Sequence, residues 1–171
     1  MKRATHVLDA VLKVLADQGI GALSVRTVAA AAGVSPAQVQ YYYRTKSDLV
    51  RAGFEYAGEQ FLAEIEAAQP ETISGFVELW LPVDEPRARR ARVWLAYAAA
   101  AVVDPVLRKE NAKLDRELRQ WYVDAGLSED LAAQVFAMID GVTLQCLSLP
   151  MAERRALADR TVGAFLAALP G

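Results

Sequence analysis

Amide, phenol and amine side chains are concentrated between residues 38 and 46 of the sequence. Gln38 and Gln40 precede three consecutive tyrosines, at 41, 42 and 43, and Lys46 follows three residues later. A glutamine can bond bidentately to adenine in the major groove, and a lysine can neutralise a phosphate. These residue types are typical of nucleic-acid recognition.

Candidates for bond-making chemistry are few in the rest of the chain. His6 is the only histidine and Cys146 the only cysteine, which excludes an intrachain disulfide and a zinc site built from Cys and His. A catalytic triad with a histidine base could use only His6. Carboxylates are scattered singly, without a Glu-x-x-His pair or a nucleophile motif. We therefore expect no enzyme activity, no metal and no cofactor.

Length and composition favour one folded domain, or one domain with a small satellite. The chain has 171 residues, of which 54% are hydrophobic and 23% are charged, so it can bury a sizeable core. No stretch approaches the roughly 18 uninterrupted apolar residues of a membrane span, and the N-terminus lacks the pattern of a secretory signal. These features predict a cytoplasmic protein that does not enter a membrane.

The formal net charge of −2 hides an asymmetry along the chain. The first 60 residues carry 7 Lys+Arg and 5 Asp+Glu, whereas the remainder carries 12 and 16. A locally basic segment is the electrostatic footprint of a nucleic-acid surface. Such a surface is therefore expected in the N-terminal third.

The whole sequence predicts an all-α fold. Alanine and leucine are frequent, and apolar residues recur at three-to-four spacing without sustained alternation. Ser24, Ser35 and Thr45 are expected N-caps, and Gly33 and Pro70 are expected stops. The predicted helices number about nine and cover residues 4–18, 24–33, 35–42, 45–68, 75–81, 84–103, 105–126, 128–150 and 152–169.

The second and third predicted helices form a helix-turn-helix. Ala29 and Ala30 are small enough to let two helices cross closely, Gly33 permits the sharp turn, and Val34 supplies an apolar plug beneath it. The third helix begins with a capping box, since Ser35 is its N-cap, Pro36 its first residue and Gln38 lies three residues after the cap. This helix presents Ala37, Gln38 and Tyr41 on one side.

The run from Leu23 to Val50 resembles the DNA-binding segment of the tetracycline-repressor (TetR) family of bacterial regulators. The shared features are Ser-Val-Arg at 24–26, Ala-Gly-Val-Ser at 32–35, the tyrosine cluster and Lys-x-x-Leu at 46–49. The resemblance implies an N-terminal DNA-binding domain over residues 1–46, joined by a long helix to a ligand-binding and dimerisation domain over 47–171. The implied partners are a double-stranded, palindromic operator, a second copy of the chain and a small apolar or amphipathic ligand.

The family's DNA contacts can be transferred residue by residue. Lys46 matches a lysine that contacts the DNA backbone, and Tyr42 stands where an aromatic residue meets a phosphate. Gln40 stands where the family most often has tyrosine, and Tyr43 replaces its usual phenylalanine, which leaves the bound base sequence open. The resemblance implies DNA contacts for Arg26, Thr27, Ser35, Pro36, Ala37, Gln38, Gln40, Tyr41, Tyr42 and Lys46.

Structural alternatives exist for several of these residues. Lys46 and Arg26 could be solvated surface cations, and Gln38 could be committed to its capping box. A cation in the first turn of a helix opposes the helix dipole, so Lys46 is better explained by a phosphate bound there. Tyr43 is expected to pack in the core beneath the turn.

Two features of the C-terminal part have both a core and a binding interpretation. The arginines at 87, 89, 90 and 92 are expected to be solvated or ion-paired rather than to bind nucleic acid. Aromatic residues at helical spacing are usually core, but an apolar pocket with a few polar tips also makes a small-molecule site. The pocket candidates are Phe61, Trp80, Trp94, Tyr97, Trp121 and Tyr122.

The last two predicted helices carry more apolar surface than one small bundle needs. Small residues between the larger ones permit close approach, which favours a two-fold interface between copies of the chain. Two recognition helices could then read the half-sites of a palindrome. The interface candidates are Leu131, Val135, Met138, Ile139, Val142, Cys146, Phe165 and Leu166.

The favoured function is a homodimeric, sequence-specific repressor that a small molecule releases from DNA. The principal alternative is a regulator of the same fold that activates transcription or acts without an inducer. A dimeric module that has lost DNA binding is a further alternative, which the retained Lys46 and Tyr42 disfavour.

Overall fold

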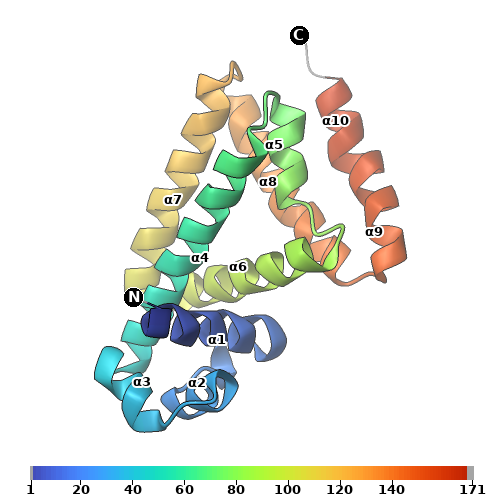
Figure 1. Cartoon of the computed structure of the whole chain (residues 1–171). Helices are drawn as coiled ribbons and strands as arrows, with labels where there is room; N and C mark the ends of the chain where they lie inside the picture. Colours follow the sequence, from blue (N-terminus) through green and yellow to red (C-terminus); the bar gives the residue numbers. More distant parts are fainter. Residues whose placement is uncertain (1, 169–171) are drawn as a thin grey trace.

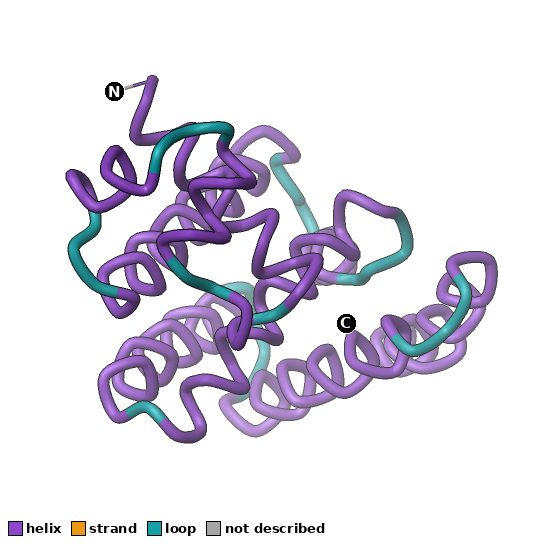
Figure 2. Tube along the Cα trace, turned by 90° about the horizontal axis from the view of Figure 1, so that it is seen from below, coloured by secondary structure: helices purple, strands orange, loops and turns teal. Residues whose placement is uncertain are grey.

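The computed structural model describes residues 2–168, with side chains from residue 5 onward. Helices joined by short loops make up that part of the chain, and no strand occurs within it (Figures 1 and 2). The all-α class expected from the apolar periodicity is confirmed. Leu169, at the predicted end of the last helix, lies outside the described residues.

The helices begin and end close to the predicted positions. A 3-10 turn, η1 (Ile20–Ala22), links the first two, and a π-helical turn, η2 (Asp159–Gly163), joins the last two into one rod (Figure 1). The helices are α1 (Lys2–Gln18), α2 (Val25–Ala32), α3 (Pro36–Tyr42), α4 (Lys46–Ala68), α5 (Ile73–Trp80), α6 (Glu85–Val103), α7 (Pro105–Asp124), α8 (Glu129–Leu147), α9 (Met151–Ala158) and α10 (Ala164–Ala167).

Side-chain caps explain why the helices begin where they do. Ser24, Ser35 and Thr45 each form a reciprocal capping box, which satisfies N–H groups that a helix start leaves without partners. The start of α5 differs from the prediction. Thr72 is its N-cap and accepts a 3.1 Å hydrogen bond from the N–H of Gly75, so this helix begins before residue 75.

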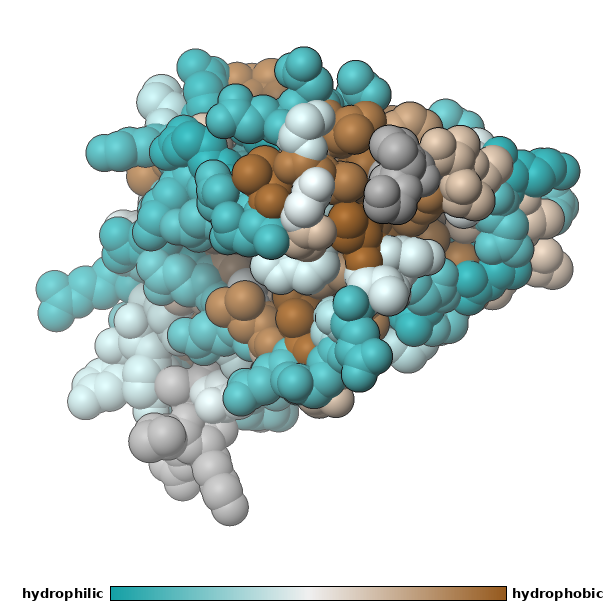
Figure 3. All heavy atoms as spheres, turned by 90° about the horizontal axis from the view of Figure 1, so that it is seen from above, coloured by the Kyte–Doolittle hydropathy of each residue, from teal (hydrophilic) through white to brown (hydrophobic). Residues whose placement is uncertain are grey.

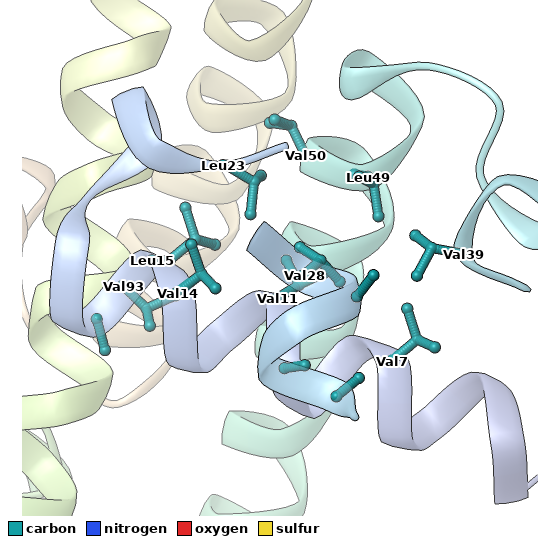
Figure 4. Close-up of a cluster of buried hydrophobic side chains, with 14 of the residues drawn as sticks. Val7, Val11, Val14, Leu15, Leu23, Val28, Val39, Leu49, Val50 and Val93 are labelled. Carbon is teal, nitrogen blue, oxygen red and sulfur yellow. The ribbon is translucent and has the colours of Figure 1, made fainter. Parts of the chain in front are cut away.

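The first of two buried clusters lies where α1, α2, α3, the start of α4 and the middle of α6 meet. Its side chains are almost all aliphatic and converge between these helices (Figure 4). Because they come from five helices, the cluster fixes the helix-turn-helix against the rest of the chain. We call α1, α2, α3 and the first two turns of α4 the head. The largest aliphatic members of the cluster are Val7, Val11, Val14, Leu15, Leu23, Val28, Val39, Leu49, Val50 and Val93.

The second cluster holds together the remaining helices, which we call the body. Phe76 and Tyr122 are its largest buried members, and the apolar face of α8 supplies much of the rest. The buried Arg154 ties the start of α9 to the loop before α6, because its Nε donates to the Leu149 carbonyl over 3.1 Å and its Nη1 donates to the Pro82 carbonyl over 3.2 Å. In the π-helical turn, the Thr161 hydroxyl donates to the Leu157 carbonyl over 2.7 Å.

α4 belongs to both clusters. Leu49 and Val50 lie in the head cluster, whereas Ile65, about four turns further along the helix, packs against the body cluster. The two clusters therefore meet within α4, and the domain boundary predicted between residues 46 and 47 stays a prediction. Leu62, an apolar residue of the same helix, belongs to neither cluster and is 66% exposed.

Head and body pack tightly against each other at Gly53 of α4. A Cβ atom built at this residue would lie 2.6 Å from both Tyr97 Oη of α6 and Val11 Cγ1 of α1. The Tyr97 hydroxyl donates a 2.9 Å hydrogen bond to the Val50 carbonyl of α4. Since α6 lies across the top of α1 (Figure 1), these contacts join three helices at one point.

Candidate DNA-binding surface and ligand cavity

The turn between α2 and α3 has the backbone that the sequence predicts. Gly33 adopts the left-handed region at φ 63°, and the Val34 N–H donates to the Ala29 carbonyl over 3.0 Å. The helix crossing uses Ala29 and Ala32, which are buried. Ala30, predicted to share in this crossing, faces solvent, because it lies on the other side of the two-turn helix.

One side of α3 packs against the head cluster, and the opposite side faces solvent. Val39 is fully buried, and Tyr43, directly after the helix, packs against the head cluster as predicted, where burial raises its pKa. Tyr41 is 81% exposed and Tyr42 44% exposed, with their rings edge to face. Exposure of the two apolar rings to water is unfavourable, and contact with a partner surface would remove this exposure.

The two glutamines of α3 differ in how they are held. Gln38 Oε1 accepts hydrogen bonds from the Ser35 N–H and the Ser35 hydroxyl, so its oxygen is committed to the cap. A bidentate contact from Gln38 to adenine would require opening this cap. Gln40 is exposed on the neighbouring side of the helix, and its side chain has no hydrogen bond to any residue from 5 to 168. Gln40 is therefore the freer of the two base-reading candidates.

The start of α4 has the features that favour anion binding. Thr45 caps the helix, and the hydrogen bond with Thr45 holds the pKa of the Asp48 carboxyl below its usual range. The N–H groups of Lys46 and Ser47 are left at the open end, and the exposed Lys46 side chain forms no ion pair within residues 5–168. A phosphate would accept from these N–H groups and neutralise the lysine.

The remaining predicted contacts of the head lie in the first turn of α2 and at the start of α3. Arg26 is exposed at the start of α2. Thr27 is the second half of a capping box, in which its hydroxyl donates to the Ala22 carbonyl over 2.8 Å and accepts from the Ser24 N–H over 3.0 Å. The hydroxyl of Thr27 is thus occupied by the fold, which disfavours its predicted role on DNA. Ser35, Pro36 and Ala37 are exposed on the outer side.

His6 is a head residue that the sequence interpretation left without a role. It donates from Nε2 to the Ala32 carbonyl over 2.7 Å, closing the end of α2. It also borders a shallow recess together with Gln38, Tyr41 and Tyr42. No local motif marks this contact, because 26 residues separate the two partners.

The charge of the head is more strongly positive than the first 60 residues suggest. Residues 1–52, which include the first two turns of α4, contain seven Lys+Arg and three Asp. This balance favours a polyanion at the surface formed by α3 and the start of α4.

The body contains a cavity of about 280 Å³ between α4, α5, α6, α7 and α8. Four of the predicted aromatic residues line it, namely Phe61, Trp80, Trp94 and Trp121. Viewed from the end of the body opposite the head, hydrophobic residues gather in a central band between hydrophilic flanks (Figure 3). The size and the apolar lining match those of small-molecule sites.

Tyr97 and Tyr122 were predicted for this cavity, and the structure places them outside it. Both are fully buried in the two clusters, and burial raises the pKa of each phenol. Each side chain points into its buried cluster, so neither one lines the cavity. Phe76, whose ring stacks on Trp121 with centroids 3.7 Å apart, is a cavity residue that the sequence interpretation missed.

The arginines of α6 are mostly ion-paired, as predicted. Arg87 contacts Glu78 over 3.0 Å, and Arg92 contacts Glu85 over 2.6 Å. Arg90 pairs with Glu64 of α4, donates to the Leu79 carbonyl, and lies with its guanidinium carbon 4.7 Å from the Phe61 ring centroid. Arg90 therefore forms part of the cavity wall in addition to joining α4, α5 and α6.

Half of the predicted interface residues are buried within the chain itself. Val135, Ile139, Val142 and Cys146 belong to the body cluster and cannot meet a second copy, so this part of the prediction is wrong. Leu131, Met138, Phe165 and Leu166 are half-buried. The side of α8 that is left open carries Ala133, Ala137, Asp140 and Leu144, with Gln134 and Gln145 beside them. Leu144 is 56% exposed.

Comparison with known proteins agrees with this architecture. Residues 7–52 match the family described as bacterial regulatory proteins, tetR family, and residues 69–171 match the family described as BetI-type transcriptional repressor, C-terminal. The chain belongs to the tetR family of bacterial regulatory proteins and is a DNA-binding transcriptional regulator. Within that family, its C-terminal part is of the BetI type.

Individual relatives share most of their length with this chain. The HTH-type transcriptional regulator BetI of Rhizobium meliloti (strain 1021) is 27% identical over 156 residues, which cover 84% of this chain and 77% of that protein. A transcriptional regulator from Rhodococcus sp. Rha1 has a similar structure, with a TM-score of 0.81, 26% identity and coverage of 97% and 98% of the two chains. The multidrug binding protein EbrR complexed with imidazole has a TM-score of 0.67 at 27% identity, covering 99% and 97%.

Proposed function

We propose that this regulator is a cytoplasmic, homodimeric repressor that leaves a palindromic operator when a small molecule fills the aromatic cavity. The observation that carries the proposal is the stack between Trp94 on the cavity wall and Phe54 on α4, with ring centroids 5.5 Å apart. α4 begins at Lys46 in the head, so a ligand that displaces Trp94 acts on the helix that carries the DNA-binding surface.

Further contacts extend this connection toward the head. The Phe54 ring also meets the Tyr97 ring edge to face, with centroids 4.8 Å apart, and Tyr97 is hydrogen-bonded to the Val50 carbonyl. A ligand shifts a two-state equilibrium only by its differential affinity for the two states. A bound molecule that favours one orientation of Trp94 and Phe54 would therefore favour one orientation of α4, and with it one spacing of the two heads in a dimer.

The outer face of α8 supports pairing of two copies. By length and composition alone this helix is apolar enough to cross a membrane, with a mean hydropathy of 1.2, yet only 33% of that window is buried inside the described chain. Ala133, Ala137 and Leu144 are exposed along one side of it, at positions that a helical repeat brings together, and the exposed Asp140 lies between Ala137 and Leu144 on the same side. Small residues permit two helices to approach closely, so a second copy is the cover that we propose.

The C-terminal rod offers a comparable face. Ala152, Ala156, Gly163 and Ala164 are exposed along α9, the π-helical turn and α10. Two such faces from each copy would form a four-helix contact, with the half-buried Met138 and Phe165 at its border. In such a dimer each head would read one half-site of the palindrome.

Oligomeric state is tested by sedimentation velocity on the intact protein. We expect a dimer, and we expect Ala137→Arg to convert it to a monomer, because two guanidinium groups would face each other across the two-fold axis. Ala63→Arg, on the exposed side of α4, is the matched control and should remain a dimer. A monomeric parent protein, or an unchanged mass for Ala137→Arg, would contradict this arrangement.

Repression is tested by fluorescence anisotropy with a labelled duplex from the DNA flanking the protein's own gene. We expect saturable binding that a scrambled duplex of equal length does not match and that weakens steeply as salt rises. Transcription from the same promoter should fall when the protein is added in a purified system. Equal affinity for the scrambled duplex, or increased transcription, would refute a sequence-specific repressor.

A further inference from the structure

Two uncharged polar groups on residues that line the aromatic cavity form no hydrogen bond within residues 5–168. Thr143 of α8 is only 9% exposed, and its hydroxyl meets no partner in this part of the chain. Nε1 of Trp80, at the end of α5, is buried and also lacks a partner there. A buried polar group without a hydrogen bond is uncommon and unfavourable, because it has lost its bonds to water. A ligand could supply the missing hydrogen bonds.

A second threonine of the body makes the bond that Thr143 does not make. The Thr161 hydroxyl donates to the Leu157 carbonyl, four residues earlier, over 2.7 Å. This bond within the helix is a common arrangement for a helical threonine. Thr143 does not make the equivalent bond to Ile139, so its hydroxyl keeps its capacity to donate and to accept.

The neighbours of Trp80 supply no good acceptor for its indole N–H. The Trp80 ring centroid lies 4.1 Å from that of Phe61 and 6.0 Å from that of Trp94, and both pairs are edge to face. An aromatic ring is only a weak acceptor, and an indole N–H can only donate. The missing partner of Trp80 is therefore an acceptor. Since α5 and α8 contact each other, Trp80 and Thr143 lie on neighbouring walls of the cavity.

The charged groups at the border of the cavity do not call for a charged ligand. Arg90 pairs with Glu64, and Glu117 lies 3.6 Å from the ammonium of Lys113. Asp140 reaches the border from the exposed side of α8, and partial desolvation raises its pKa to about 6, so charge is disfavoured even there. An anion would meet no unpaired cation, and a cation would lose its hydration without an unpaired counterion inside the cavity.

We propose that the cavity binds an uncharged molecule with an apolar or aromatic body and a carbonyl oxygen, which accepts from the Thr143 hydroxyl and from Trp80 Nε1. The inference rests on the ligand-responsive function proposed above and names the chemical class of that ligand. A carbonyl oxygen has two lone pairs and can accept from both donors. The body of the molecule would lie against Trp94 and Trp121. A hydrocarbon of the same shape would leave both donors unpaired, so the site would discriminate against it.

Isothermal titration calorimetry on the intact protein tests the proposal with four probes of similar shape. Acetophenone carries the carbonyl, α-methylstyrene has a carbon–carbon double bond in its place, benzoate is negatively charged and phenyltrimethylammonium is positively charged. We expect saturable binding of acetophenone and roughly tenfold weaker binding of α-methylstyrene, because the hydrocarbon makes neither hydrogen bond. Both charged probes should bind more weakly than acetophenone.

The variant Thr143→Val keeps the shape of the side chain and removes its hydroxyl. It should weaken acetophenone binding about fivefold without weakening α-methylstyrene binding, which also shows that the variant is folded. Thr161→Val is the matched control, because the Thr161 hydroxyl is bonded within its own helix and Thr161 does not line the cavity. This control should bind both probes like the parent.

The infrared carbonyl stretch of bound, isotope-labelled acetophenone reports the hydrogen bonds directly. Hydrogen bonding weakens the carbonyl bond, so the frequency should be lower in the parent than in Thr143→Val. Trp80→Phe, which keeps an aromatic ring and removes the N–H, should raise the frequency as well.

Several results would overturn the proposal. They are the absence of acetophenone binding, equal affinity for acetophenone and α-methylstyrene, tighter binding of either charged probe, and an unchanged carbonyl frequency in Thr143→Val. DNA release is measured separately by anisotropy. Acetophenone binding without release from DNA would refute the repressor mechanism alone, whereas release by a charged probe with no acetophenone binding would refute the uncharged class alone.

Discussion

The buried clusters of head and body are built from different residue types. The head cluster is mainly valine, alanine and leucine, whereas the body cluster contains Phe76 and Tyr122 and is bordered by Trp80, Trp121, Phe136 and Phe165. Aliphatic side chains from five helices converge in the head cluster, whereas aromatic rings in the body surround a cavity of about 280 Å³. The head is therefore suited to hold one geometry, and the body is suited to admit a guest molecule.

A truncation within the head cluster should have the largest effect on stability. Leu49 is fully buried on α4, and Leu49→Ala should lower the free energy of unfolding by about 2–5 kcal/mol, because the tight cluster cannot collapse around the void. Leu62→Ala, on the exposed side of the same helix, should change it by less than about 0.5 kcal/mol. Urea unfolding monitored by circular dichroism measures both. Similar losses for the two variants would show that the head is not the tighter region.

The contact point between the two regions should be the next most sensitive position. Gly53→Ala places a methyl group 2.6 Å from Tyr97 Oη and Val11 Cγ1 and should lower the free energy of unfolding by about 1–3 kcal/mol through overpacking. Gly58→Ala, one turn and a half further along α4, meets no atom within 4 Å and should stabilise the helix by up to about 1 kcal/mol. Urea titrations measure the free energy of unfolding of both variants. A Gly53→Ala protein that is more stable than the parent would refute the close packing at this point.

An exposed cation of the head should affect DNA binding without affecting stability. Lys46→Ala should weaken binding to all duplexes about fivefold at 0.15 M salt, and should lower the slope of log affinity against log salt by about one, because one phosphate contact is lost. Lys13→Ala removes a lysine that is paired with Asp17 over 2.7 Å, and should leave the slope unchanged. Anisotropy titrations at several salt concentrations give both slopes, and equal slopes for Lys46→Ala and the parent would exclude the phosphate contact.

A charge in the body should have the smallest and most pH-dependent effect on stability. The pKa of Asp140 is raised to about 6, so the folded state binds this proton more tightly than the unfolded state does, and stability increases as the pH falls through this range. Asp140→Asn removes the penalty of the charged form. Its melting temperature should exceed that of the parent by less than about 4 °C at pH 7.5, and the difference should vanish below about pH 4. Thermal melts between pH 4 and pH 7.5 measure this difference in melting temperature. A variant that melts below the parent at pH 7.5 would contradict the predicted direction of the effect.

Local signals explain most of what could be predicted from sequence. The caps Ser24, Ser35 and Thr45, and the turn at Gly33, depend on residues within a few positions, and the structure has them where expected. Thr72 was missed because Gly75 was read as the start of that helix, although the threonine three positions earlier supplies the cap.

Packing direction could not be predicted in the same way. On α8, residues that face the body cluster and residues that would face a second copy are both apolar, so the periodicity selected Val135 and Cys146 for the interface although they are internal. Trp94 and Tyr97 lie on the same helix, yet one lines the cavity and the other is buried beside Gly53. Asp140 carries no motif, because its environment is made by helices distant in sequence.

The π-helical turn at Asp159–Gly163 gives the C-terminal rod an unusual response to changes in length. A π turn contains one residue more than an α turn, so the segment that follows is rotated by about 100° relative to a continuous α-helix. Deletion of one residue here would leave the rod helical but would turn Phe165 and Leu166 away from the body cluster against which they pack. A loop can change in length without moving the helices that it joins. A change in length at this turn would instead change which face of the last helix a neighbouring molecule meets.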